Sequence, residues 1–111
     1  MNKTVNILGT EYTIQESTES KDATLQGKDG YCDTTVKLCV VEEMNERKPG
    51  MKLDLSMYKK AVTRHEIIHA FLYESGLEIC SDWAQNEEMI DWIAIQFPKI
   101  QKVFVELGCD E

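Results

Sequence analysis

Two histidines four residues apart, with a glutamate beside the first, are the residues best suited to chemistry in this chain. His65, Glu66 and His69 form the pattern H-E-x-x-H. Positions four apart on an α-helix point the same way and lie about 6 Å apart, so both imidazoles can bind one metal ion. The glutamate then lies beside the ion, where its carboxylate can accept a proton from a bound water. The chain has only these 2 histidines, which favours a metal site over two unrelated histidines on an amphipathic helix.

A catalytic zinc usually takes three protein ligands and leaves a fourth position for water. Because the chain has no third histidine, the third ligand must be a carboxylate or a cysteine. The best source is the acidic run N-E-E-M-I-D at residues 86–91. In this run Asp91 lies one helical turn after Glu87, where it can accept a hydrogen bond from the outer N–H of a ligand histidine.

The element that must position the histidine pair is a helix over residues 55–75, closed by Gly76. Asp54 or Ser56 can cap its first turn. The helical period predicts an apolar face that the two histidines share with core residues. This face runs through Ala61, His65, Ile68, His69 and Leu72, and Met57, Val62 and Phe71 widen it.

The acidic run begins a second helix, expected over residues 86–97. Pro98 should break it or start a fresh turn, since proline has no N–H for the helical ladder. A short third helix is then expected over residues 99–107, ending at Gly108. Its inward-facing residues are expected to be Ile100, Val103, Phe104 and Leu107.

The N-terminal half favours β-hairpins. Residues 5–8 and 12–14 are short β-prone runs around a Gly-Thr turn, and residues 31–33 and 36–41 form a second such pair. The polar segment 17–30 between them is expected to be a loop. Run 36–41 has two open interpretations. At a sheet edge above the metal it could hold an extended peptide by strand addition, and otherwise it is an ordinary core strand.

The composition limits the class of protein. A chain of 111 residues, 42% of them hydrophobic, supports one domain with one small core. It has no apolar run of about 20 residues and no secretory signal, so we expect no membrane partner and a cytoplasmic location. A net charge of −8 disfavours nucleic acid. The four cysteines, Cys32, Cys39, Cys80 and Cys109, contain no C-x-x-C pair and are expected to be reduced thiols.

Both motifs together resemble those of the gluzincin metallopeptidases, in which H-E-x-x-H is followed by a helix carrying N-E-x-x-x-D or a near variant. The order of elements is also similar to that of small phage-encoded zincin-like proteins. The resemblance implies an α+β fold over residues 1–111, in which a small, twisted, mostly antiparallel sheet packs on an active-site helix and a glutamate helix. It further implies a zinc ion bound by His65, His69 and Glu87, with Glu88 as the competing third ligand. Glu66 would be the general base that activates the zinc-bound water, and Asp91 would support a ligand histidine.

The chain departs from the larger gluzincins in one respect. They carry a tyrosine or histidine beyond the glutamate helix that stabilises the oxyanion, whereas this chain has neither after Glu87. Tyr73 and Tyr31 are the candidate substitutes. The function expected is therefore a zinc-dependent peptide-bond hydrolase acting on a protein or peptide, with narrow or unknown specificity. The alternative is a catalytically weak or inactive metal-binding module that binds another protein.

Overall fold

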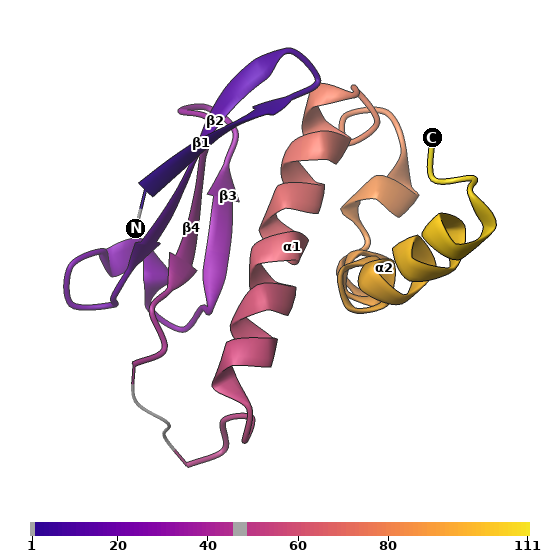
Figure 1. The fold of residues 1–111 in the computed structure, drawn as a ribbon. Coiled ribbons are helices and arrows are strands. Elements are labelled where there is room, and N and C mark those ends of the chain that lie inside the picture. The colour runs from indigo at the N-terminus through magenta and orange to yellow at the C-terminus, as the bar shows by residue number, and fades with distance from the viewer. Residues whose placement is uncertain (1, 46–48) are drawn as a thin grey trace.

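The computed structural model describes residues 2–45 and 49–111. A four-stranded sheet lies on one side of the helix α1 (Leu55–Glu74), and a second long helix, α2 (Glu87–Leu107), crosses the other side of α1 (Figure 1). This arrangement confirms the predicted α+β class. It differs from the implied packing in that α1, and not the sheet, is the main surface against which α2 packs.

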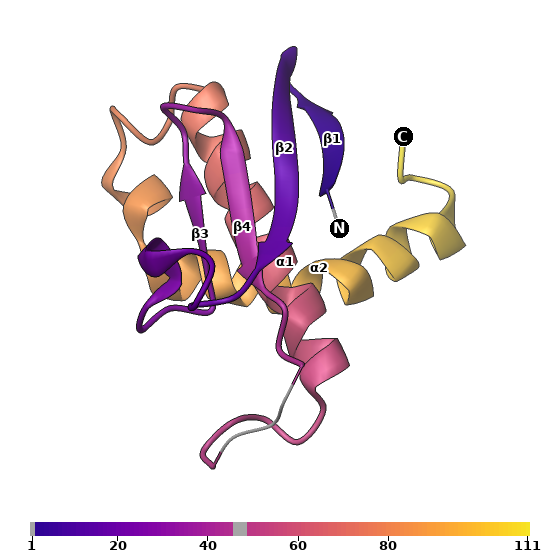
Figure 2. The same cartoon turned by 90° about the vertical axis from the view of Figure 1, so that its left-hand side faces the viewer.

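The sheet is mixed. Its strands follow the order β1-β2-β4-β3, with antiparallel outer pairs and a parallel central pair (Figure 2). The strand bounds are β1 Asn2–Ile7, β2 Thr10–Ser17, β3 Gly30–Asp33 and β4 Leu38–Glu42. Both predicted hairpins are confirmed, and the polar loop between them contains one short 3-10 helix, η1 (Ala23–Leu25).

The structure separates the two interpretations of run 36–41. Its strand, β4, is central, with Cys39, Val40 and Val41 fully buried, while Val36 is 64% exposed in the preceding turn. The edge interpretation is therefore wrong for this run. Its high β propensity reflects burial in the middle of the sheet, whereas β1 and β3 form the two edges.

Helix α1 begins and ends as expected. The side chain of Asp54 accepts a hydrogen bond from the Met57 N–H over 3.0 Å, so Asp54 is the cap. At the other end Gly76 has φ = 83°, a conformation that glycine adopts without strain. The predicted apolar face is only partly correct, because Met57 is 70% and Phe71 42% exposed.

The side chains of α1 that are buried are Glu66, Ala70 and Leu72, and of these only Leu72 belongs to the predicted face. Ala70 joins Ile7, Tyr12 and Cys39 in the core between the helix and the sheet. A second cluster on the other side of α1 contains Leu72, Ala84 and Ile90, where Ala84 comes from the short helix η2 (Asp82–Gln85). Because α1 lies between two layers, two of its faces are covered, and a single apolar stripe does not describe it.

Helix α2 runs through Pro98 without a break, so the predicted pair of helices is wrong. Pro98 cannot donate to the carbonyl of Ala94, which an α-helix would require at this position. The side chain of Arg64 on α1 supplies the missing donor, since its Nε lies 2.5 Å from that oxygen.

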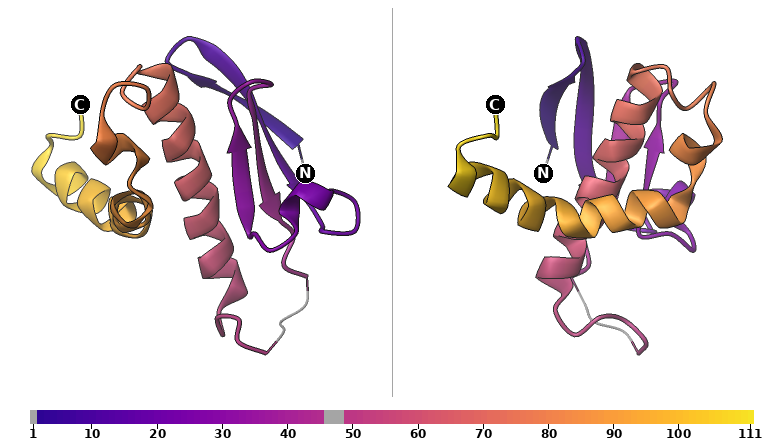
Figure 3. Two further views of the ribbon diagram at one scale, coloured as in Figure 1. Left: turned by 180° about the vertical axis from the view of Figure 1, so that it is seen from behind. Right: turned by 90° about the vertical axis from the view of Figure 1, so that its right-hand side faces the viewer.

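The predicted burial of the last helical segment is also wrong. Val103, Phe104 and Leu107 are 50%, 46% and 75% exposed, because this half of α2 projects past α1 (Figure 3). Within residues 2–45 and 49–111, neither helix is long and apolar enough to cross a membrane.

Candidate metal centre

The two histidines of α1 face the same point. The Nε2 atoms of His65 and His69 lie 3.1 Å apart, and the rings meet edge to face with centroids separated by 4.8 Å. The helix produces this convergence directly, because residues four apart lie one above the other on its surface. The imidazoles lie on the side of α1 from which Glu87 and Asp91 of α2 reach them.

Glu87, the first residue of α2, lies against both imidazoles. Its Oε2 atom is 2.9 Å from His65 Nε2, and its Oε1 atom is 3.0 Å from His69 Nε2. The helix can start at this residue because Asn86 caps it, accepting from the Met89 N–H over 2.9 Å. Of the two candidate glutamates, the structure therefore brings Glu87 to the histidines.

Glu88 lies elsewhere. Its side chain lines a shallow hollow together with Met89, Trp92 and Ile95, and this hollow does not include either histidine. Successive helical residues point about 100° apart, so only one of the two glutamates can face α1.

Asp91 holds the orientation of His65. Its Oδ1 atom is 2.6 Å from His65 Nδ1. Because a carboxylate only accepts hydrogen bonds, this contact places the imidazole proton on Nδ1 when the ring is neutral. The lone pair of Nε2 then points to His69 and Glu87, which is the arrangement a metal ligand requires.

The spacing of these donor atoms suits one small divalent cation. Zinc lies about 2.0–2.2 Å from nitrogen and carboxylate ligands in a tetrahedral site, so neighbouring ligand atoms are about 3.3 Å apart. The distances here are 3.1 Å between the imidazole nitrogens, and 2.9 and 3.0 Å from these nitrogens to Glu87. Lone pairs converging in this way repel one another unless a proton or a cation lies between them. The donor set therefore fits zinc.

Glu66 lies beside this cluster but is buried. Its carboxylate has an oxygen within 4.8 Å of the ligand nitrogens of His65 and His69, and the residue is only 6% exposed. Burial raises the pKa of this carboxyl to about 7, and the charges of Glu87 and Asp91 act in the same direction. A cation at the histidines would oppose this rise by favouring the carboxylate. With a cation bound, Glu66 would be held as the carboxylate, the form that accepts a proton from water.

Gly30 is a site residue that the sequence analysis did not identify. A Cβ atom at this position would lie 3.1 Å from Glu66 Oε2 and 3.0 Å from both Val40 O and Val62 Cγ1. Only glycine lets the edge strand β3 come this close to the buried carboxylate. The sequence shows a glycine before a β-prone run, but nothing in it indicates which helix the glycine will contact.

Two clefts meet at the site. One, of about 330 Å³, is lined by residues of β3 such as Tyr31 and Cys32, and by Glu87. The other, of about 390 Å³, is lined by residues nearer the start of α1, including Tyr58. The two clefts share three of their lining residues, Gly30, His65 and Glu66. The two clefts therefore adjoin at His65 and the buried glutamate, and the smaller one also includes His69.

The two candidate oxyanion donors are placed differently. Tyr31 lines a cleft, but its hydroxyl donates to Asp22 over 2.5 Å, and burial together with this bond raises its pKa to about 12. Tyr73 lines neither cleft, and its ring lies 5.0 Å from the Lys37 ammonium. Tyr58, which the sequence analysis did not consider, lines the larger of these clefts and donates its hydroxyl to Asp29.

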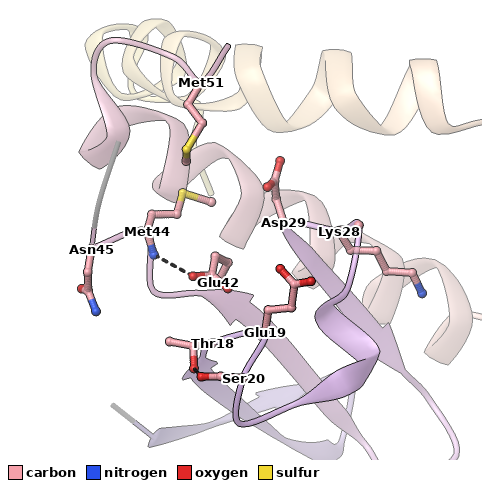
Figure 4. Close-up of a pocket in the computed structure, with 10 residues that line it drawn as sticks. Thr18, Glu19, Ser20, Lys28, Asp29, Glu42, Met44, Asn45 and Met51 are labelled. Atoms are coloured by element: carbon pink, nitrogen blue, oxygen red, sulfur yellow. Dashed lines mark hydrogen bonds between the residues drawn. The ribbon is translucent and has the colours of Figure 1, made fainter. Parts of the chain in front are cut away.

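A larger hollow than either of these two clefts lies elsewhere in the described part of the chain. It has a volume of about 730 Å³ and lies between the loop after β2, the end of β4 and the segment before α1 (Figure 4). Its walls carry carboxylates such as Glu19 and Glu42, and the sulfur atoms of Met44 and Met51. It includes neither histidine, so size alone does not identify the site with ligand chemistry.

Among the residues that the structure describes, His65, Glu66 and His69 are grouped with their ligand atoms within 4.8 Å of one another, and Glu87 reaches the same two imidazoles. No protein-family model matches the chain, and no curated protein or solved structure is detectably similar to it. The function must therefore be inferred from the side chains of the site.

Proposed function

We propose that this protein is a zinc-dependent peptide-bond hydrolase, with zinc held by His65, His69 and Glu87. The observation that carries the proposal is the meeting of two imidazole nitrogens and one carboxylate within 3.1 Å of one another, next to a buried glutamate. When bound, zinc would act as a Lewis acid that polarises the scissile carbonyl and lowers the pKa of the attacking water.

The protein's own groups would handle the protons. Glu66 accepts the proton of the attacking water and passes it to the leaving amine. Its burial at 6% exposure keeps bulk water from competing for that proton. Asp91 keeps the proton of His65 on Nδ1, over 2.6 Å, so that Nε2 stays available as a ligand.

An extended peptide is the substrate shape that the cleft beside β3 favours. Strand β3 stands at one end of the sheet order, so one of its edges has no strand partner within the described residues. Tyr31 and Cys32 of this strand line the cleft that also contains His65 and Glu87. A peptide that adds to the edge of β3 would therefore run past the histidine pair.

A second candidate function is a metal-binding interaction module without catalysis. The observation that favours it is the engagement of two cleft hydroxyls: Tyr31 donates to Asp22, and Tyr58 donates to Asp29. Loss of one oxyanion donor lowers a rate by about 10²–10³. A protein that uses its tyrosines in this way could bind peptides without cleaving them.

Glu66→Gln separates the two functions. Elemental analysis should find zinc in both the parent and the variant, since the histidines and Glu87 are unchanged. A library of unstructured peptides should be cleaved by the parent, and cleavage should stop in the variant or in the presence of a chelator. Glu88→Gln is the matched control and should leave both properties intact. Cleavage by Glu66→Gln at the parental rate would disprove the mechanism, and zinc binding without cleavage by the parent would favour the second function.

A further inference from the structure

Two of the four cysteines lie directly opposite each other in the sheet. The antiparallel register of β3 and β4 pairs Cys32 with Cys39. Three steps further along the same ladder, Asp29 lies opposite Glu42. These two residues form a hydrogen-bonded pair, because the Glu42 N–H donates to the Asp29 carbonyl over 2.9 Å. Hydrogen-bonded and non-hydrogen-bonded pairs alternate along an antiparallel ladder, so Cys32 and Cys39 form a non-hydrogen-bonded pair.

This kind of pair brings side chains closest together. Its Cα atoms lie about 4.5 Å apart, which is within the range of about 4.4–6.8 Å that a disulfide can span. Opposed residues also point to the same face of the sheet, here the face toward α1, where Cys39 is in the core and Cys32 packs against it. The neighbouring Cys32 thiol, together with burial, raises the pKa of Cys39.

The two sulfur atoms differ in access. Cys32 is partly exposed and lines the cleft that contains His65 and His69, whereas Cys39 has no exposed surface. The Cys39 thiol donates to the carbonyl of Glu66 over 3.6 Å. An oxidant entering the cleft would therefore meet Cys32 first, with Cys39 directly behind it.

We propose that Cys32 and Cys39 are a redox site that a hydroperoxide converts into a disulfide across β3 and β4. The Cys32 sulfur attacks the peroxide, the O–O bond breaks, and Cys32 becomes a sulfenic acid while the peroxide is reduced to an alcohol or to water. The Cys39 sulfur then attacks the Cys32 sulfur, so that the S–S bond forms and the S–O bond breaks. The oxygen leaves as water with the Cys39 proton.

The bridge would form immediately behind the metal centre. It would fix the edge strand β3 to β4 beside Gly30 and remove the thiol that donates to the Glu66 carbonyl. The other two cysteines cannot substitute for this pair. Cys80 and Cys109 are exposed, and in the sheet register Cys39 is the partner of Cys32.

The test uses the full chain with Cys80→Ser and Cys109→Ser, both at exposed positions, so that only the pair remains. Hydrogen peroxide is added in small excess, free thiols are alkylated, and trypsin then cuts after Lys28, Lys37 and Arg47. The expected product is a cross-linked pair of peptides, residues 29–37 joined to residues 38–47. Both thiols should be lost at the same rate, and a reducing agent should restore both.

Cys32→Ser in the same background is the control. It should leave the buried Cys39 thiol available for alkylation after unfolding. Oxidation of Cys32 to the sulfinic acid while Cys39 stays a thiol would overturn the proposal. Two thiols that both survive the peroxide treatment would overturn it as well. None of these readouts depends on zinc or on hydrolysis.

Discussion

The guanidinium of Arg64 donates from Nε to the carbonyl oxygen of Ala94 over 2.5 Å. This contact joins the residue before the first histidine of α1 to the residue one turn after Asp91 on α2. Ala94 is 1% exposed, so its carbonyl has no access to bulk water. Pro98 has no N–H to donate to this carbonyl. The Arg64 side chain therefore both completes the hydrogen bonding of α2 and fixes the position of α2 against α1.

Arg64→Met should therefore lower the free energy of unfolding by about 1–3 kcal/mol, the cost of leaving a buried acceptor unpaired. In a Pro98→Ala background the backbone N–H of residue 98 can donate to Ala94 itself. In that background Arg64→Met should lower the free energy of unfolding by about 1 kcal/mol less than it does in the parent. Urea unfolding of the four proteins measures this coupling. Lys60→Met, at an exposed lysine on the same helix, should change stability by less than about 0.5 kcal/mol. An equal cost of Arg64→Met in both backgrounds would show that the bond does not compensate for the proline.

Asp91→Asn should weaken zinc binding without abolishing it. The hydrogen bond to His65 Nδ1, 2.6 Å long, orients the ring and increases the basicity of Nε2. Loss of such a partner typically lowers metal affinity about 10- to 100-fold. Competition against a chromophoric chelator measures the change, and Glu88→Gln on the outer face of α2 should have no effect. An unchanged affinity for Asp91→Asn would remove Asp91 from the proposed site.

Local spacing predicted that the two histidines share one face of a helix, because they lie one turn apart. The resemblance to the gluzincins favoured Glu87 over Glu88, with Asp91 one turn after it, and the structure adds the cap at Asn86 that starts the helix there. The hairpins followed from turn residues and alternation. These features depend on neighbours in the sequence, which is why they could be predicted.

The features that were missed depend on contacts between distant elements. By the local rule Pro98 should break the helix. The helix continues because Arg64, from the other helix, donates to the Ala94 carbonyl in place of the missing N–H. Leu107 belongs to an apolar stripe, but it is exposed because α2 is longer than the surface of α1 that it covers. The close approach of Gly30 to Glu66 likewise exists only once β3 packs on α1. A periodic pattern gives the orientation of a side chain within its element, and not what lies opposite it.

Gly30→Ala should be destabilising and should also disturb the site. The new methyl would lie 3.0 Å from Val40 O, a backbone atom that cannot move aside without shifting β4, and 3.1 Å from Glu66 Oε2. Overpacking of this kind costs about 1–3 kcal/mol. Thermal unfolding measures the loss. A second substitution, Val62→Ala, removes one of the three contacts and should restore part of the stability. A Gly30→Ala protein as stable as the parent would contradict the close packing of β3 on α1.

Glu74 should make the fold sensitive to acid. At the end of α1 its carboxylate accepts from Tyr12 Oη over 2.7 Å, from Lys37 Nζ over 2.9 Å and from Thr10 Oγ1 over 3.0 Å. These contacts join the helix to the first hairpin and to the turn before β4. The hydrogen bond from Tyr12, followed by that from Lys37, lowers the pKa of Glu74 below its ordinary value of 4.5.

A carboxyl whose pKa is lower in the folded than in the unfolded state binds fewer protons when folded. Its stabilising contribution is therefore fully present above pH 4.5 and is lost as the pH falls through the lower pKa of the folded state. Glu74→Gln should be less stable than the parent at pH 7, and the difference should shrink as the pH falls below 4.5. Urea midpoints across this range measure it, with Glu106→Gln on the exposed end of α2 as the control. A difference that stays constant down to the lowest pH would mean that the charge of Glu74 does not stabilise this junction.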